Sequence, residues 1–129
     1  MNEGLDACRV AIVYDHADDA RFDWDYYLAR HLPLAVGTSL GHCRISDCDA
    51  DRPLTPAPGA PLCICVVYFP DETAMQRFRD LFATGHADTA PVIADEPNYT
   101  NITPAFHACR HHPHYTAGDI GAAAGHRLY

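Results

Sequence analysis

The chain has 129 residues, of which 48% are hydrophobic, and this length predicts one globular domain over residues 1–129, with residues 111–129 as a C-terminal tail. The formal net charge is −8, and the basic residues are arginines scattered along the chain, which excludes an extended basic surface for nucleic acid. No apolar run reaches the roughly 18 residues of a membrane span, and the N-terminus lacks the pattern of a signal peptide. We therefore expect a cytoplasmic protein that binds neither nucleic acid nor membranes.

The six cysteines lie mainly in apolar, strand-like segments. A disulfide framework of three bridges is one interpretation of this number. Because the sequence shows no export signal, buried reduced thiols are the favoured interpretation.

The first part of the chain predicts a strand followed by a helix. Residues 8–14, CRVAIVY, are apolar at both alternating sets of positions, which is typical of a strand covered on both faces. Residues 23–32 predict a helix with Asp23 as N-cap, and Pro33 predicts that this helix ends or kinks there. The residues at helical spacing on one face are Trp24, Tyr27, Leu28 and His31.

The remaining elements are two further strands, a helix and a last strand. Residues 42–49 predict a weaker, more polar strand, and the proline-rich residues 50–61 predict a loop. Residues 62–69 form the most apolar strand, and residues 71–85 are an amphipathic helix that ends in glycine. Residues 99–109 predict a strand interrupted by proline, which is typical of a sheet edge.

The order βαββαβ predicts an α+β fold, the ferredoxin-like sandwich, in which two helices cover one face of a four-stranded antiparallel sheet. Strands 8–14 and 62–69 are apolar on both faces, so the uncovered face would expose a large apolar patch. We therefore expect a homodimer that covers this face, and a small cavity between the sheet and its helices.

Two segments resemble the sequence patterns of a known family. Residues 22–34, FDWDYYLARHLPL, fit F-D-x-x-Y-Y-x-x-x-H-x-P-L, and residues 95–104, DEPNYTNITP, fit D-x-P-N-Y/F-T-x-x-x-P. Both patterns resemble the EthD family of the dimeric α+β barrel superfamily, and the resemblance covers residues 8–110. Two positions depart from the family: Glu96, where an aliphatic residue is more usual, and His107, where glutamine is frequent.

The resemblance implies a homodimer of ferredoxin-like subunits, each with a cleft between sheet and helices for a small, mostly apolar molecule. Related barrels include cofactor-independent oxygenases, cyclases, dehydratases, lactone isomerases and lyases. Because one architecture hosts so many activities, the resemblance supports the fold more firmly than the reaction.

His31 is the candidate acid/base, because helical spacing puts it on the face that carries Trp24 and Tyr27 and should look toward the sheet. An imidazole titrates near pH 6.5, so a carboxylate that holds one ring nitrogen leaves the other as a base near neutrality. Asp95 is the candidate for that carboxylate, and Tyr27 or Tyr99 for holding a substrate oxygen. The alternatives are a packed histidine, a loop-capping aspartate and core tyrosines.

Two further groups of residues carry potentially reactive side chains. Cys65 has no neighbouring base or cation in the sequence to activate it, so we expect a small buried residue beside the substrate. Within residues 107–114, HACRHHPH, a continuing strand would put His107, Cys109 and His111 on one face. Their spacing fits no closed structural zinc pattern, so we assign no metal site, and a solvated histidine-rich end is the simpler interpretation.

The sequence therefore predicts a small enzyme without a cofactor that transfers protons on a small apolar or aromatic carbonyl compound, as a lyase, dehydratase, isomerase or cyclase. The predicted catalytic residues are His31 and Asp95, and the predicted substrate-binding residues are Trp24, Tyr27, Tyr99 and Cys65. The alternatives are a non-catalytic binding protein for a hydrophobic metabolite in the same cleft, and a metal-binding protein that uses the C-terminal histidines.

Overall fold

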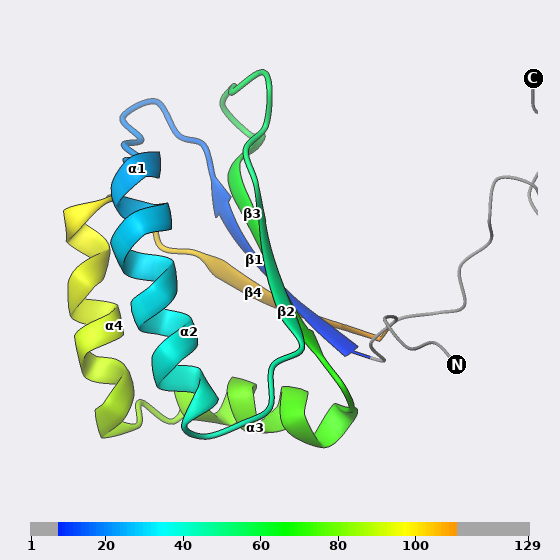
Figure 1. The fold of residues 1–129 in the computed structure, drawn as a ribbon. Helices are drawn as coiled ribbons and strands as arrows, with labels where there is room; N and C mark the ends of the chain where they lie inside the picture. Colours follow the sequence, from blue (N-terminus) through cyan, green and yellow to red (C-terminus); the bar gives the residue numbers. More distant parts are fainter. Residues whose placement is uncertain (1–7, 111–129) are drawn as a thin grey trace, which may run out of the picture.

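The computed structural model describes residues 8–110, which form an α+β sandwich (Figure 1). Four antiparallel strands are arranged in the order β2-β3-β1-β4. Their bounds are Cys8–Asp15 for β1, Asp47–Asp51 for β2, Pro61–Phe69 for β3 and Ala105–Arg110 for β4. This order is that of the ferredoxin-like fold, so the predicted fold class is confirmed. The predicted tail, residues 111–129, lies outside the described residues.

The helices lie on one face of this sheet (Figure 1). The first is one continuous helix of three parts: α1 (Trp24–Tyr26), the π-helical turn η1 (Tyr27–His31) and α2 (Leu32–Leu40). The others are α3 (Glu72–Ala83), the 3-10 turn η2 (Ala87–Thr89), α4 (Ala90–Asp95) and the 3-10 turn η3 (Glu96–Asn98). Among the described residues, no helix has the length and apolar character needed to cross a membrane.

The first helix begins as predicted but does not end at Pro33. Asp23 is its N-cap and accepts a hydrogen bond from the backbone N–H of Tyr26 at 3.1 Å. The helix then continues to Leu40, seven residues beyond the proline. Proline has no N–H and its ring collides with a carbonyl of the preceding turn, and the wider π turn directly before it changes that geometry. Of the two expectations for Pro33, an end of the helix was therefore wrong.

Helix α4 was missing from the predicted order. It has only six residues and contains Pro91 in its first turn. A proline is tolerated there, because the N–H groups of the first turn have no acceptor within the helix. Helix α4 could not be predicted from the periodicity of apolar residues, because it is short and has two prolines in or near it. Two strands also start later than predicted, at Asp47 and Ala105.

Helix α3 follows its sequence signals closely. Asp71 caps it by accepting the backbone N–H of Ala74 at 2.8 Å. Just after it, Gly85 has φ +67°, a left-handed conformation that glycine adopts without the steric cost of a side chain. Phe78 packs against Phe69 of β3 with ring centroids 5.2 Å apart, which fixes α3 on the sheet.

The two faces of the sheet differ in burial. On β3, the side chains of Cys63, Cys65, Val67 and Phe69 are buried under the helices, and the alternate residues are half-buried. All six cysteines lie among the described residues and are free thiols, and four of them are buried. Leu28 was expected on the buried face of the first helix, but it is 50% exposed. It lies within the π turn, where the angle between successive side chains differs from that of an α-helix.

Candidate active site

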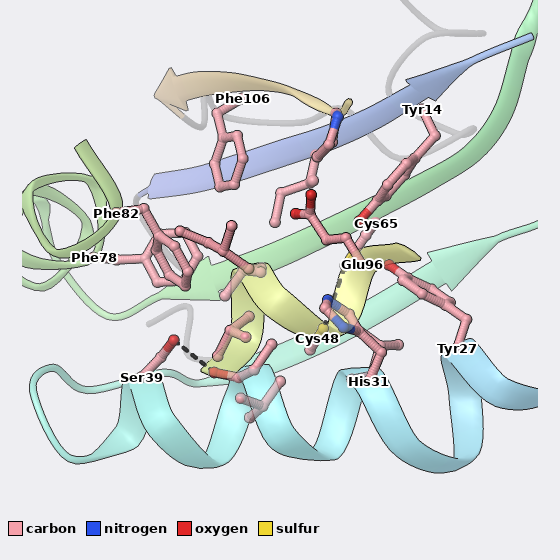
Figure 2. Close-up of a pocket in the computed structure, with 18 of the residues that line it drawn as sticks. Tyr14, Tyr27, His31, Ser39, Cys48, Cys65, Phe78, Phe82, Glu96 and Phe106 are labelled. Atoms are coloured by element: carbon pink, nitrogen blue, oxygen red, sulfur yellow. Dashed lines mark hydrogen bonds between the residues drawn. The ribbon is translucent and has the colours of Figure 1, made fainter. Parts of the chain in front are cut away.

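A cavity of about 260 Å³ lies between the sheet and the helices (Figure 2). Its walls come from the first helix and the neighbouring helix α4, from α3, and from all four strands of the sheet. Most lining side chains are apolar, and they include Leu32, Val36, Val67, Phe78, Phe82 and Phe106. The space therefore suits a small, mainly apolar molecule.

His31 closes the π turn and is one of the few ionisable side chains in this wall. It is only 4% exposed. Its ring stacks on Tyr27 with centroids 5.8 Å apart and an interplanar angle of 15°, and it lies 4.4 Å from the ring of Tyr99. These contacts lock the imidazole in one orientation.

The predicted contact between Asp95 and His31 is present. Oδ2 of Asp95 lies 3.1 Å from Nδ1 of His31, although the two residues are 64 positions apart. Since an ionised carboxylate only accepts hydrogen bonds, Nδ1 of a neutral His31 carries the hydrogen and Nε2 keeps the lone pair. Among residues 8–110, none forms a hydrogen bond with Nε2, so this nitrogen is available to a molecule in the cavity.

The pKa values of the pair favour a neutral imidazole beside an ionised carboxylate. Burial lowers the pKa of His31, and the hydrogen bond and charge of Asp95 oppose this shift only in part. Burial acts to raise the pKa of Asp95, but hydrogen bonds from Tyr26, Asn98 and His31 outweigh it and lower this pKa. Near neutral pH, His31 is therefore a base.

Tyr26 holds Asp95 in place, a role that the sequence did not predict. Its hydroxyl donates to Oδ1 of Asp95 at 2.5 Å, and Nδ2 of Asn98 donates to the same oxygen at 3.0 Å. In an α-helix, residues five apart point about 140° away from each other, which separates Tyr26 from His31. The π turn brings such residues onto one side, so a 3.6-residue period could not find this tyrosine.

Only some of the predicted substrate-binding residues line the cavity. Tyr27 lines the cavity. Tyr99 is fully buried outside the lining, and its hydroxyl pairs with that of Tyr14 at 2.7 Å. Trp24 also lies outside the lining, where it packs on Phe22. The cavity therefore meets Tyr14 and Tyr27, and Tyr99 supports them from behind.

Cys65 lines the cavity as predicted and is 1% exposed. Its sulfur lies 3.7 Å from that of Cys48 on the neighbouring strand β2. Both thiols face the cavity, so they form a compact, polarisable part of its wall.

Glu96 is a further lining residue that the prediction of site residues omitted. It follows Asp95 directly at the start of η3, and Figure 2 shows its carboxyl group pointing into the cavity. Burial raises its pKa. The available signal in the sequence was its departure from the aliphatic residue usual at this position of the EthD pattern.

Potential metal ligands cluster elsewhere, in an exposed region. Ligand atoms of His42, His86 and Asp88 lie within 4.8 Å of one another. His42 Nε2 is 2.8 Å from an Asp88 carboxyl oxygen, and His86 Nδ1 accepts the backbone N–H of Asp88 at 3.0 Å. These hydrogen bonds explain the grouping without a metal ion. In the C-terminal cluster, His107 and Cys109 are exposed on β4, and the rest lies outside the described residues.

The fold is similar to two solved structures. The crystal structure of an EthD-like protein from Ralstonia eutropha JMP134 is 22% identical, with a TM-score of 0.61 over 81% of this chain and 92% of that one. The described fold is EthD-like. An ethyl tert-butyl ether (EthD) family protein from Bacillus halodurans C-125 is 14% identical, with a TM-score of 0.49 over 82% and 99% of the two chains. No family model and no curated protein matches the sequence.

Proposed function

We propose that this protein is a small acid–base enzyme that acts on a small apolar or aromatic carbonyl compound without an organic cofactor. The proposal depends on one observation: His31 lies in the wall of an apolar cavity with Nδ1 held by Asp95 and Nε2 left with a lone pair. A base of this kind typically accelerates proton transfer by ~10²–10⁴. The reaction class is a lyase, dehydratase, isomerase or cyclase.

The geometry supports removal of a proton from carbon beside a carbonyl group. Nε2 of His31 takes the proton, the C–H electron pair moves into the carbonyl to form an enolate, and Asp95 stabilises the resulting imidazolium. The enolate oxygen needs a donor. Burial raises the pKa of Tyr27 far above its usual range, so its hydroxyl keeps its proton and serves as that donor from within the wall. Return of the proton to another atom completes an isomerisation.

Deuterium exchange tests this proposal without knowledge of the natural substrate. The probe is phenylacetone in buffered D₂O, and NMR follows deuterium entering the position next to the carbonyl. We expect catalysed exchange with the unmodified protein and a loss of about 100-fold or more with His31→Gln. His86→Gln, a change of an exposed histidine outside the cavity, is the matched control and should leave the exchange rate unchanged. Equal rates for all three proteins would contradict the proposal.

The alternative function is a binding protein for a hydrophobic metabolite. The stacking of His31 on Tyr27 and its contact with Tyr99 favour this alternative, because they give the histidine a packing role. Native mass spectrometry of the freshly isolated protein separates the two functions. A binding protein retains a small molecule and catalyses no exchange.

We also propose a homodimer formed through the sheet face that lacks helices. On the two central strands, β1 and β3, the side chains of this face are mostly apolar and only half-buried in one chain, and they include Ala11, Val13, Ile64 and Val66. A contiguous apolar area of this kind is typical of an interface. A second copy that presents the same face would cover it by two-fold symmetry.

A further inference from the structure

Glu96 is the unusual component of the cavity. Its neighbours in the wall are largely aliphatic and aromatic, such as Val92, Ile93 and Phe106. Within the described part of the chain, no residue donates a hydrogen bond to its carboxyl group. Glu96 is half-buried, so a ligand that covers its carboxyl group removes it from water, and a donor on that ligand would offset the cost.

Glu96 lies close to the pair of His31 and Asp95 but does not take part in the hydrogen bond between them. Asp95 ends α4 and turns toward His31, and Glu96 begins η3 and lines the cavity. The charge of Glu96 acts on Tyr14 and Tyr99, whose pKa values burial raises first and this charge raises further. The pKa of His31, in contrast, is set by burial and Asp95. Glu96 therefore forms a second polar group of the cavity, beside Tyr14.

We propose that Glu96 selects ligands that combine an apolar body with a hydrogen-bond donor, either a hydroxyl or an ammonium group, placed against its carboxyl group. This inference deepens the proposed function and rests on the cavity being the ligand site. It names the substrate class: a carbonyl compound that also carries such a donor. An aliphatic residue at this position would accept only the apolar body.

The test compares the binding of three probes of similar shape: phenol, anisole and benzylamine. Isothermal titration at neutral pH should show that the unmodified protein binds phenol or benzylamine at least about tenfold more tightly than anisole. A preference for benzylamine identifies a cationic ligand, and a preference for phenol a neutral one. Glu96→Leu should abolish the preference. Glu96→Gln, which keeps the shape and loses the charge, should lose any preference for benzylamine.

Binding and exchange together separate this inference from the acid–base proposal. The matched control is Glu72→Leu, which removes an exposed glutamate outside the cavity and should keep the preference for the donor-bearing probe, because Glu96 is unchanged. A protein that shows this preference but no deuterium exchange would overturn the catalytic role of His31 and support the role of Glu96. The role of Glu96 would be overturned by equal affinities for the three probes or by a failure of both phenol and benzylamine to bind. An unaltered preference in Glu96→Leu would also overturn it.

Discussion

One carboxylate, that of Asp95, contacts two residues of the first helix: Oδ2 lies 3.1 Å from Nδ1 of His31, and Oδ1 accepts the hydroxyl of Tyr26 at 2.5 Å. Each oxygen thus has its own partner. The π turn places Tyr26 of α1 and its own last residue, His31, on one side of the helix, and the short helix α4 supplies the carboxylate. A strained or unusual turn at a functional site is a common arrangement, and here it orients the candidate base.

Replacing Asp95 with asparagine should impair His31 without removing it. The amide keeps the shape, but the charge that raises the pKa of His31 is lost, so this pKa should fall further below its usual value. We expect the exchange rate with phenylacetone to fall by about tenfold or more. NMR of the imidazole nitrogens measures the pKa and the tautomer directly. An unchanged pKa and rate would show that Asp95 only caps its loop.

The pH dependence of exchange should have a rising limb below pH 6.5. Burial lowers the pKa of His31 from 6.5, and the neutral form is the base. The exchange rate should therefore increase with pH through this lowered pKa and level off above it. A midpoint above 6.5 would contradict the assignment.

The same shift affects stability with a defined sign. Because the pKa of His31 is lower in the folded than in the unfolded state, the unfolded chain binds the proton first as pH falls. The protein is therefore most stable with respect to this group above pH 6.5, and its free energy of unfolding falls as the pH drops from 6.5 toward the pKa of His31 in the folded state. Urea denaturation of the unmodified protein and His31→Gln should show this difference, and parallel pH curves would refute it.

Replacing Tyr26 with phenylalanine should act on His31 through Asp95. The hydrogen bond from Tyr26 helps to lower the pKa of Asp95, so this pKa should rise in the variant. Exchange should slow, but less than in Asp95→Asn. Tyr68→Phe removes the hydroxyl of another tyrosine that is paired with an aspartate, Asp49, outside the cavity, and it serves as the control. If both variants slow exchange equally, Tyr26 has no specific role.

The order and faces of the strands could be predicted because their signals are local. Short runs that are apolar at both alternating sets of positions define β1 and β3, and this pattern predicted that both faces of the strands are covered. The first helix was harder, because the effect of Pro33 depends on the π turn before it. Helix α4 is too short for periodicity to detect.

The candidate site was predictable only in part. Helical spacing and the family resemblance pointed to His31, but no local signal connects it with Asp95, 64 positions away, so that pairing came from the general chemistry of histidine sites. Tyr26 could not be found with α-helical spacing. The placement of Tyr99 behind the wall depends on its hydrogen bond to Tyr14, a contact between segments 85 residues apart.

The proposed dimer predicts a strong effect of a charge on the outer face of β3. Ile64→Glu would bury an unpaired carboxylate at the centre of the proposed interface, at a cost of several kcal/mol. Light scattering after size exclusion should show a dimer for the unmodified protein and a monomer for Ile64→Glu. Leu54→Glu is the control, because Leu54 is 99% exposed. A monomeric unmodified protein would exclude the proposed interface.

Filling the cavity should abolish ligand binding while the fold is retained. Ala35 lines the cavity from α2, and a phenylalanine there would place an apolar ring in the space of about 260 Å³. Because the ring fills an existing void, we expect the free energy of unfolding to change by less than about 1.5 kcal/mol. Binding of phenol and exchange of phenylacetone should both fall at least about tenfold, because the ring occupies their place. Ala29→Phe, on the exposed side of the same helix, should leave both unchanged. Normal binding and exchange in Ala35→Phe would place the ligand site outside this cavity.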